Sequence, residues 1–292
     1  MPSFRSKCCC AWLALGVVLF TRGVSLLAQQ RPLQTQEPAI LPPGNVSLQL
    51  GFDFLQDAKY PLSGLRGDLT SLGVTGIYIG LGEIVEFQMQ GTIYNFLSIN
   101  QRSSTPLDLT LKSGGTSTSD FGDLSFSTKI LLVSEKRRFP ALAFAPTVQL
   151  PNASAAKGLG LDSTQFYGTL LAGKHLGKLN AFGNVGLGIL SNPVEAGVQN
   201  DVMVYGAGGI CPLAPAVNLA TEVYGRWNTR KAGAPLGTES QSVFRLGVQI
   251  NGLGFRWDVS GLAGLAKNSP RSGVSFGVTK ELRVFRIGAK KN

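Results

Sequence analysis

Residues 122–151, GDLSFSTKILLVSEKRRFPALAFAPTVQLP, decide the fold that the sequence predicts. In the first half of this stretch, every second residue belongs to a mainly apolar set: Leu124, Phe126, Thr128, Ile130 and Leu132. Polar residues alternate with that set: Ser125, Ser127 and Lys129. After the charged residues 134–138 the apolar alternation resumes: Leu142, Phe144, Pro146, Val148 and Leu150. Because successive side chains of a strand point to opposite faces, the pattern predicts a β-hairpin with one apolar face.

The rest of the chain repeats this pattern between frequent turns. It has 292 residues, of which 37 are glycine, 15 are proline and 15% are charged, and its mean hydropathy is +0.14. Glycine and proline occur along the whole length, which is typical of many short strands joined by turns. The alternation predicts twelve strands, over residues 46–55, 67–80, 83–97, 121–134, 139–150, 163–175, 178–190, 201–211, 216–227, 239–250, 254–265 and 272–281.

Long and short connections alternate between these strands. Long ones such as residues 56–66 and 98–120 are followed by short ones such as residues 81–82. An up-and-down antiparallel sheet carries all turns of one parity at the same end, and bacterial outer-membrane barrels have short periplasmic turns and longer external loops. We therefore predict an all-β protein, a closed up-and-down antiparallel transmembrane β-barrel of about 12 strands (12–14), with both termini in the periplasm.

Periodicity alone also fits a soluble barrel, in which the apolar parity would face inward. The N-terminal secretory signal, the alternating loop lengths and the lack of a second packing layer favour the membrane form. Seven charged residues on the polar parity are then candidates for lining the lumen: Glu86, Lys129, Glu222, Arg226, Arg245, Arg256 and Asp258. A cation facing lipid at mid-depth would cost about 2–4 kcal/mol. Lys129 is therefore expected inside, where it contacts either a solute or a carboxylate.

The sequence predicts that the chain has three parts. Residues 1–28 have the basic start and short apolar run of a signal peptide; the alternative is a short membrane anchor. Residues 29–44 are polar and proline-rich, which indicates an extended periplasmic lead-in that could enter the lumen as a plug. Residues 45–292 would form the barrel. Such a protein is expected in the cell outer membrane of a Gram-negative bacterium, with membrane lipid and the barrel-assembly machinery as partners.

Several classes of chemistry find no support in the sequence. Three of the four cysteines lie in the signal, so Cys211 alone forms no disulfide framework or cysteine metal site. The net charge is +10, but the basic residues are scattered without interleaved aromatics, so no nucleic-acid partner is predicted. The single histidine, His175, lies at a predicted turn without a serine and an acid beside it in sequence. We expect no catalytic residue, no metal and no cofactor.

Residues 120–190 resemble a known family of outer-membrane proteins. The similarity rests on Gly122-Asp123 followed by Lys129, on PALAFAPTVQLPNASAAKGLGLDST and on GTLLAGKHLGKLNAFGNVGLGIL. These runs are similar to the family named for the "MetA-pathway of phenol degradation". Its motif falls here on Gly122, Asp123, Pro151, Lys157, Gly158, Gly160, Lys174, Gly177 and Asn184. The resemblance implies a barrel in the outer membrane that passes small, often hydrophobic, organic molecules.

Three functions are compatible with these observations. The first is a passive outer-membrane channel or transporter for small organic solutes, including hydrophobic or aromatic ones. The second is a non-conducting structural or adhesion barrel that acts through long loops, chiefly 98–120 and 228–238. The third is an outer-membrane lipid hydrolase, which would need His175 and a serine at the membrane rim. The sequence favours the channel, since it offers no catalytic set.

Overall fold

The computed structural model describes residues 31–285, apart from 112–113, 196 and 231–232. The signal peptide predicted for residues 1–28 lies outside the described residues. Every regular element in the described part is a β-strand. No helix among the described residues has the length and apolar character needed to cross a membrane.

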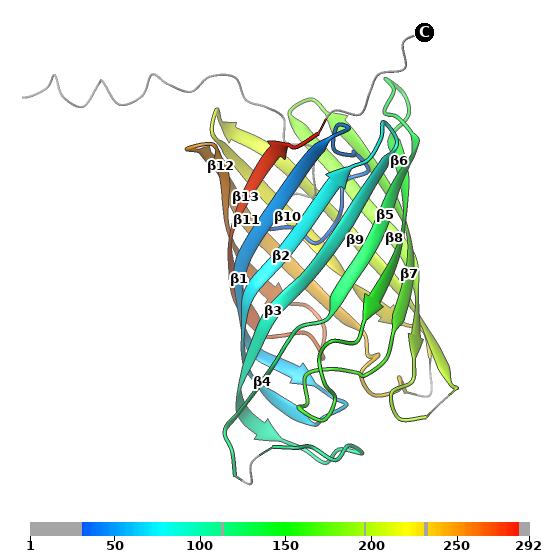
Figure 1. Cartoon of the computed structure of the whole chain (residues 1–292), viewed down its shortest axis with the longest axis vertical. Coiled ribbons are helices and arrows are strands. Elements are labelled where there is room, and N and C mark those ends of the chain that lie inside the picture. The colour runs from blue at the N-terminus through cyan, green and yellow to red at the C-terminus, as the bar shows by residue number, and fades with distance from the viewer. Residues whose placement is uncertain (1–30, 112–113, 196, 231–232, 286–292) are drawn as a thin grey trace, which may run out of the picture.

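Twelve strands form a closed antiparallel barrel, which confirms the predicted fold class (Figure 1). They are β1 (Asn45–Tyr60), β2 (Leu65–Gly80), β3 (Val85–Arg102), β5 (Leu124–Val133), β6 (Ala141–Leu150), β7 (Gln165–Leu176), β8 (Leu179–Ser191), β9 (Gln199–Ala214), β10 (Val217–Asn228), β11 (Gln241–Gly252), β12 (Phe255–Gly264) and β13 (Ser272–Arg283). Each strand pairs with the next one around the barrel, and β13 returns to pair with β1 from Asn45↔Arg283 to Gln56↔Ser272. The sheet therefore has no free edge along the wall.

Short and long connections lie at opposite ends of the barrel (Figure 1). The short turns share one end with the start of β1 and the end of β13. The turn between β11 and β12 needs only Leu253 and Gly254, whose φ angles are +56° and +75°. Positive φ at both central residues is the geometry of the tightest hairpin turns. The other end carries longer loops, including residues 151–164 and 229–240.

One expected long connection does not exist. The sequence predicted a long loop over residues 56–66, but β1 and β2 extend to Tyr60 and Leu65 and leave only residues 61–64 as a turn. The strands continue because they build a small core of their own beyond the main wall, where Ala58, Leu65 and Leu97 are buried. Apolar contacts that depend on distant strands were not visible in the local alternation.

A thirteenth strand, β4 (Ser117–Asp120), was also missed. It pairs with the outer end of β3, from Asn95↔Asp120 to Ser98↔Ser117, and prolongs the wall at the long-loop end (Figure 1). Four residues are too few for a periodicity signal, and the pairing partner lies across a long loop. The strand that the sequence predicted over residues 121–134 begins only at Leu124 in the structure.

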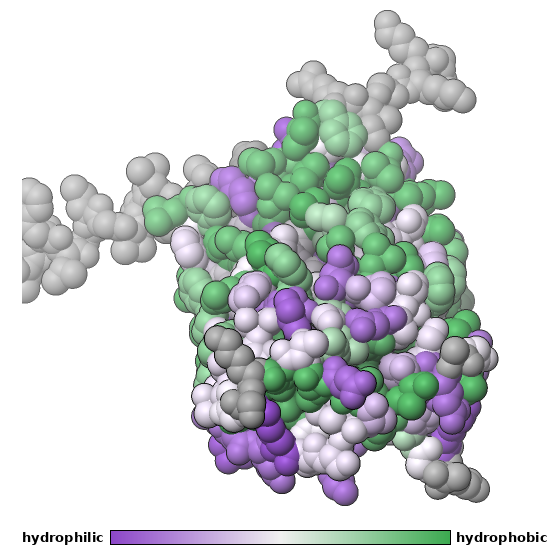
Figure 2. Space-filling model, turned by 60° about the horizontal axis from the view of Figure 1, so that its bottom comes forward, coloured by the Kyte–Doolittle hydropathy of each residue, from purple (hydrophilic) through white to green (hydrophobic). Residues whose placement is uncertain are grey.

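The two faces of the wall carry opposite chemistry. On β12, the outward side chains of Phe255, Trp257 and Val259 are 40, 37 and 47% exposed, whereas Arg256 and Asp258 face inward and are 1 and 2% exposed. Figure 2 shows hydrophobic residues over the wall and hydrophilic ones gathered at the long-loop end. An apolar outer surface around a polar interior is the reverse of a soluble barrel and matches the arrangement of barrels in lipid.

The outer face generates a first prediction. Replacing Val259, which is on the outward face of β12, by arginine should lower the free energy of unfolding by about 2–4 kcal/mol, because a cation would meet hydrocarbon. Urea unfolding of the refolded protein in phospholipid vesicles measures this. Val194→Arg in the loop 192–198 is the control and should change the free energy by less than about 0.5 kcal/mol. Equal effects of the two substitutions would show that β12 does not face lipid.

Candidate functional site

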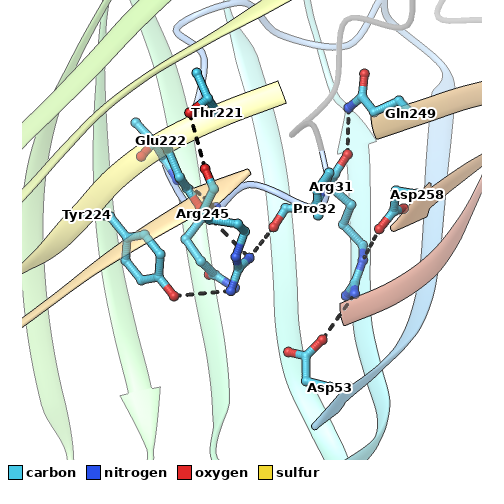
Figure 3. Close-up of polar contacts among 11 residues, drawn as sticks. Arg31, Pro32, Asp53, Thr221, Glu222, Tyr224, Arg245, Gln249 and Asp258 are labelled. Carbon is cyan, nitrogen blue, oxygen red and sulfur yellow. Dashed lines mark hydrogen bonds and ion pairs between the residues drawn. The ribbon is translucent and has the colours of Figure 1, made fainter. Parts of the chain in front are cut away.

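The proline-rich segment before β1 lies inside the barrel. Its described part starts at Arg31, beside Asp53 of β1 and Asp258 of β12, and leads to the start of β1 at the short-turn end (Figure 3). Four of its side chains are at most 3% exposed: Leu33, Thr35, Glu37 and Leu41. The entry into the lumen that the sequence left open for residues 29–44 is thus observed for the described residues 31–44. These residues are called the inner segment below.

Two carboxylates of the wall bind backbone N–H groups of the inner segment. Glu222 on β10 accepts from the N–H of Gln34 at 2.9 Å and from that of Thr35 at 2.7 Å. Glu86 on β3 accepts from the N–H of Leu41 at 2.7 Å. Both carboxylates are at most 2% exposed. Hydrogen bonds from N–H groups satisfy buried carboxylate oxygens that water cannot reach.

Three side chains of the wall bind backbone carbonyls of the same segment. Arg245 donates to the carbonyl of Pro32, and Gln249 donates to that of Arg31 at 2.5 Å (Figure 3). Lys129 donates to the carbonyl of Glu37 at 3.3 Å. The wall thus provides donors for carbonyls and acceptors for N–H groups along one peptide.

Asn184 completes this set of main-chain contacts. With its amide oriented to satisfy both groups, Nδ2 donates to the carbonyl of Gln36 at 2.8 Å and Oδ1 accepts from the N–H of Gln36 at 2.7 Å. The side chain therefore pairs with Gln36 in the way that a neighbouring strand would. Asn184 was identified only as a motif position, and its sequence gives no sign of this partner.

The buried charges of the wall are paired across neighbouring strands. Glu86 lies opposite Lys129 in the β3–β5 register, and Nζ is 3.2 Å from the carboxylate. Glu222 lies opposite Arg245 in the β10–β11 register, at 3.8 Å. Of the two roles that the sequence left open for Lys129, the structure shows the ion pair. Removing one partner of such a buried pair would leave an uncompensated charge.

The remaining predicted lumen residues also lie on the inner side. Arg256 donates to Thr279 Oγ1 at 3.2 Å, and Asp258 lies 3.5 Å from Arg31. Arg226 instead holds a loop, because it donates to the carbonyls of Gly237 and Glu239, both at 2.9 Å. Arg226 therefore fixes the loop 229–240 at the long-loop end and does not contact the inner segment.

Glycines on the inner face make room for the segment. A β-carbon at Gly277 would lie 2.6 Å from Arg31 Nε, and one at Gly173 would lie 2.7 Å from Pro38 Cδ. Other glycines stand equally close to Arg31, Pro32, Thr35 or the Leu41 carbonyl: Gly51, Gly247, Gly206 and Gly80. Glycine within a strand weakens the strand unless another group must approach closely. The high glycine content therefore has a specific use in this interior.

Two small polar cavities flank the inner segment, and Gln34 contributes to both. One, of about 200 Å³, is lined by side chains such as Gln49, Asp53 and Gln90. The other, of about 210 Å³, lies against Thr147 and other residues of the opposite wall. Both are smaller than the roughly 300–1,000 Å³ of pockets that enclose drug-sized ligands. These two cavities therefore have room only for small molecules or water beside the segment.

Most positions of the family motif serve a loop at the long-loop end, the β6–β7 loop over residues 151–164. Asp123 accepts from the N–H of Ala153 at 2.9 Å, and Asp120 accepts from Lys157 at 2.9 Å. Four further motif positions lie in or beside this region: Gly122, Pro151, Gly158 and Gly160. A β-carbon at Gly160 would lie 1.7 Å from the carbonyl oxygen of Ala153, so only glycine fits there.

Electrostatics reinforce the anchoring of this loop by Asp120. Partial burial tends to raise the pKa of its carboxyl group, but hydrogen bonds from the Ser154 N–H and from Lys157 outweigh burial and hold that pKa below its usual range. The carboxylate is thus charged at neutral pH and keeps both donors.

Apart from Asn184, the remaining motif positions are Lys174 and Gly177, which lie at the short-turn end near His175. Gly177 has φ +64° in the β7–β8 turn, and Lys174 donates to the carbonyl of Phe139 at 3.2 Å. His175 Nδ1 lies 2.6 Å from a carboxylate oxygen of Glu135, an acid that local sequence did not reveal because it belongs to another hairpin. The hydrogen bonds described for His175 include no serine hydroxyl. Across the described residues, no three potential metal ligands gather.

The fold is similar to solved outer-membrane barrels. It aligns with the COG4313 outer membrane channel from Pseudomonas putida F1 with a TM-score of 0.60 and 16% identity, over 83% of this chain and 97% of that one. The translocator domain of autotransporter NalP from Neisseria meningitidis aligns with a TM-score of 0.46 and 13% identity, over 82 and 88% of the two chains. The NanC porin aligns with a TM-score of 0.46 and 9% identity, over 83 and 100%.

These likenesses concern the fold. No family model matches the chain, and no curated protein matches it. The similarity to the "MetA-pathway of phenol degradation" family therefore stays a prediction from residues 120–190. What the COG4313 channel shares with this chain is the architecture of an outer-membrane barrel.

The close approach of the glycines generates a second prediction. In a Cys211→Ser, Thr35→Cys background, Gly173→Leu should push Pro38 away and loosen the inner segment. We expect the labelling of Cys at position 35 by a water-soluble maleimide to accelerate about tenfold or more, equivalent to ~1.4 kcal/mol. Gly252→Leu is the control, because a β-carbon at Gly252 meets nothing within 4 Å. Unchanged labelling in the Gly173→Leu variant would mean that the segment is not confined by the wall.

Proposed function

We propose that the protein is a passive channel of the cell outer membrane whose lumen is closed, in the described state, by its own inner segment. The observation that carries the proposal is the interior itself: paired, buried charges and small polar cavities surround a peptide that is held by hydrogen bonds and could withdraw. A barrel built only for mechanical stability would gain more from an apolar interior, since replacing buried ion pairs by apolar residues often stabilises a protein.

The lining supports small polar organic solutes better than hydrophobic or aromatic ones. The cavities are lined by amide, hydroxyl and carboxylate groups, including Gln49, Gln90 and Asp53. An apolar hollow of about 970 Å³ is lined mainly by outward-facing side chains such as Phe126, Phe144 and Phe166. In a bilayer that hollow would hold lipid. The polar cavities beside the inner segment thus favour polar solutes over the hydrophobic ones that the family resemblance implies.

A channel of this kind would have a defined orientation in the membrane and defined partners. In bacterial outer-membrane barrels the short turns are periplasmic, which would put the start of β1 and the end of β13 on that side. The barrel-assembly machinery and the lipid of the outer membrane are the corresponding partners, and the signal peptide over residues 1–28 would direct export. A passive channel needs neither a cofactor nor an energy source.

One observation favours a second candidate, a structural or adhesion barrel. The long-loop end has its own buried apolar cluster, which includes Leu65 and Leu97, and β4 prolongs the wall there. Such a rigid platform could present loops to an external partner. This candidate differs from the channel in a measurable way, because its lumen would stay closed when the inner segment is removed.

Deleting residues 31–41 tests the channel. The refolded variant should conduct ions in a planar bilayer with openings several times larger than those of the full mature chain, because the peptide that fills the lumen is gone. Heat-modifiable gel mobility confirms folding of both proteins. A control deletes residues 104–107 of the β3–β4 loop, which are exposed or half-buried and lie outside the lumen, and should leave conductance unchanged. A folded variant without residues 31–41 that stays silent would support the structural barrel instead.

A further inference from the structure

The wall recognises the inner segment mainly through its backbone. Three N–H groups, those of Gln34, Thr35 and Leu41, donate to buried carboxylates of the wall. Four carbonyls accept from basic or amide side chains: those of Arg31, Pro32, Gln36 and Glu37. Every peptide carries these groups, so the contacts do not depend on which side chains the peptide has.

The side chains of the segment make contacts of two kinds. Leu33 packs with Phe182, Ile210 and Ala220, and Leu41 packs with Tyr78. Ionic and polar contacts occur at Arg31, which faces two aspartates, and at Glu37, whose carboxylate accepts from Asn180 at 2.7 Å. Main-chain hydrogen bonds with a few side-chain pockets are the usual way in which proteins bind extended peptides.

The binding groups are also held by contacts within the wall. Glu86 and Lys129 lie opposite each other on β3 and β5, and Glu222 and Arg245 do so on β10 and β11. Each pair is therefore fixed by the strand register and by its own charge attraction. A site that stays ordered when empty binds a new ligand with less entropic cost. The inner-face glycines leave the space that a peptide backbone needs.

We propose that this lumen is a binding site for extended peptides, and that short peptides are the solute class of the channel. This inference rests on the proposed channel function. The inner segment occupies the site in the closed state, and a free peptide with apolar residues at the spacing of Leu33 and Leu41 takes its place when it withdraws. Phosphate esters fit less well, because they would present anionic oxygens to the buried carboxylates of Glu86 and Glu222.

The test uses four labelled peptides and fluorescence anisotropy. The first has the sequence of residues 31–41, RPLQTQEPAIL. The second keeps its prolines and leucines but permutes the residues at positions 34–37. The third carries N-methyl groups at the positions of Gln34 and Thr35, which removes the two N–H groups that Glu222 accepts. N-methylation at the position of Ala39 is the control.

Two proteins receive the peptides, so that a folding failure of one leaves the test intact. One lacks residues 31–41; the other is the full mature chain with Leu33→Asp, which should drive the inner segment out of its apolar pocket. We expect the native and permuted peptides to bind with Kd values within about threefold and to block the current. The peptide methylated at Gln34 and Thr35 should bind at least about tenfold more weakly, because it loses hydrogen bonds to a buried carboxylate.

Different failures point to different errors. If the native peptide binds and the permuted peptide does not, the site is specific for the sequence of the inner segment. That result would overturn the peptide-solute inference. Conductance by the variant lacking residues 31–41 with no peptide binding at all would overturn it too, while leaving the channel in place. A folded variant that neither conducts nor binds peptide would remove the proposed function as well. Equal affinities for all four peptides would show that the backbone N–H groups are not recognised.

Discussion

The pairing of β13 with β1 is the contact on which the rest of the structure depends. It closes the sheet, so each of the twelve barrel strands is paired on both sides and the wall has no free edge. Closure also confines one side of every strand to a narrow interior. Side chains there meet across short distances and away from bulk water, so each charge needs a partner within the protein. The outer side is free to be apolar, and it is.

The inner segment provides hydrogen-bond donors to carboxylates that closure of the barrel buries. Glu86 and Glu222 have cationic neighbours on the adjacent strands, yet their oxygens still need donors, and the N–H groups of Gln34, Thr35 and Leu41 provide them. The same charges that stabilise the closed state would line the pore once the segment leaves. A polar interior is thus costly for stability but useful for passage, and this favours a transport role over a purely structural one.

Local periodicity predicted the wall well, because alternation between two faces is written in neighbouring residues. It located all twelve barrel strands and set the seven lumen candidates on the inner parity. It missed β4, the extension of β1 and β2, and the acid beside His175, since each depends on a partner distant in sequence. The path of residues 31–44 had the same limit: composition indicated an extended peptide, but only the structure brings it against Glu222 and Lys129.

The most direct test of this account is a reversible lock between the inner segment and the wall. A β-carbon at Gly206 would lie 3.2 Å from Cβ of Thr35, close enough for a disulfide after Thr35→Cys and Gly206→Cys in a Cys211→Ser background. Single-channel recording is made before and after reductant is added. The account predicts a silent oxidised protein in which openings appear on reduction. Openings of the same size and frequency in the cross-linked protein would contradict closure of the lumen by the inner segment.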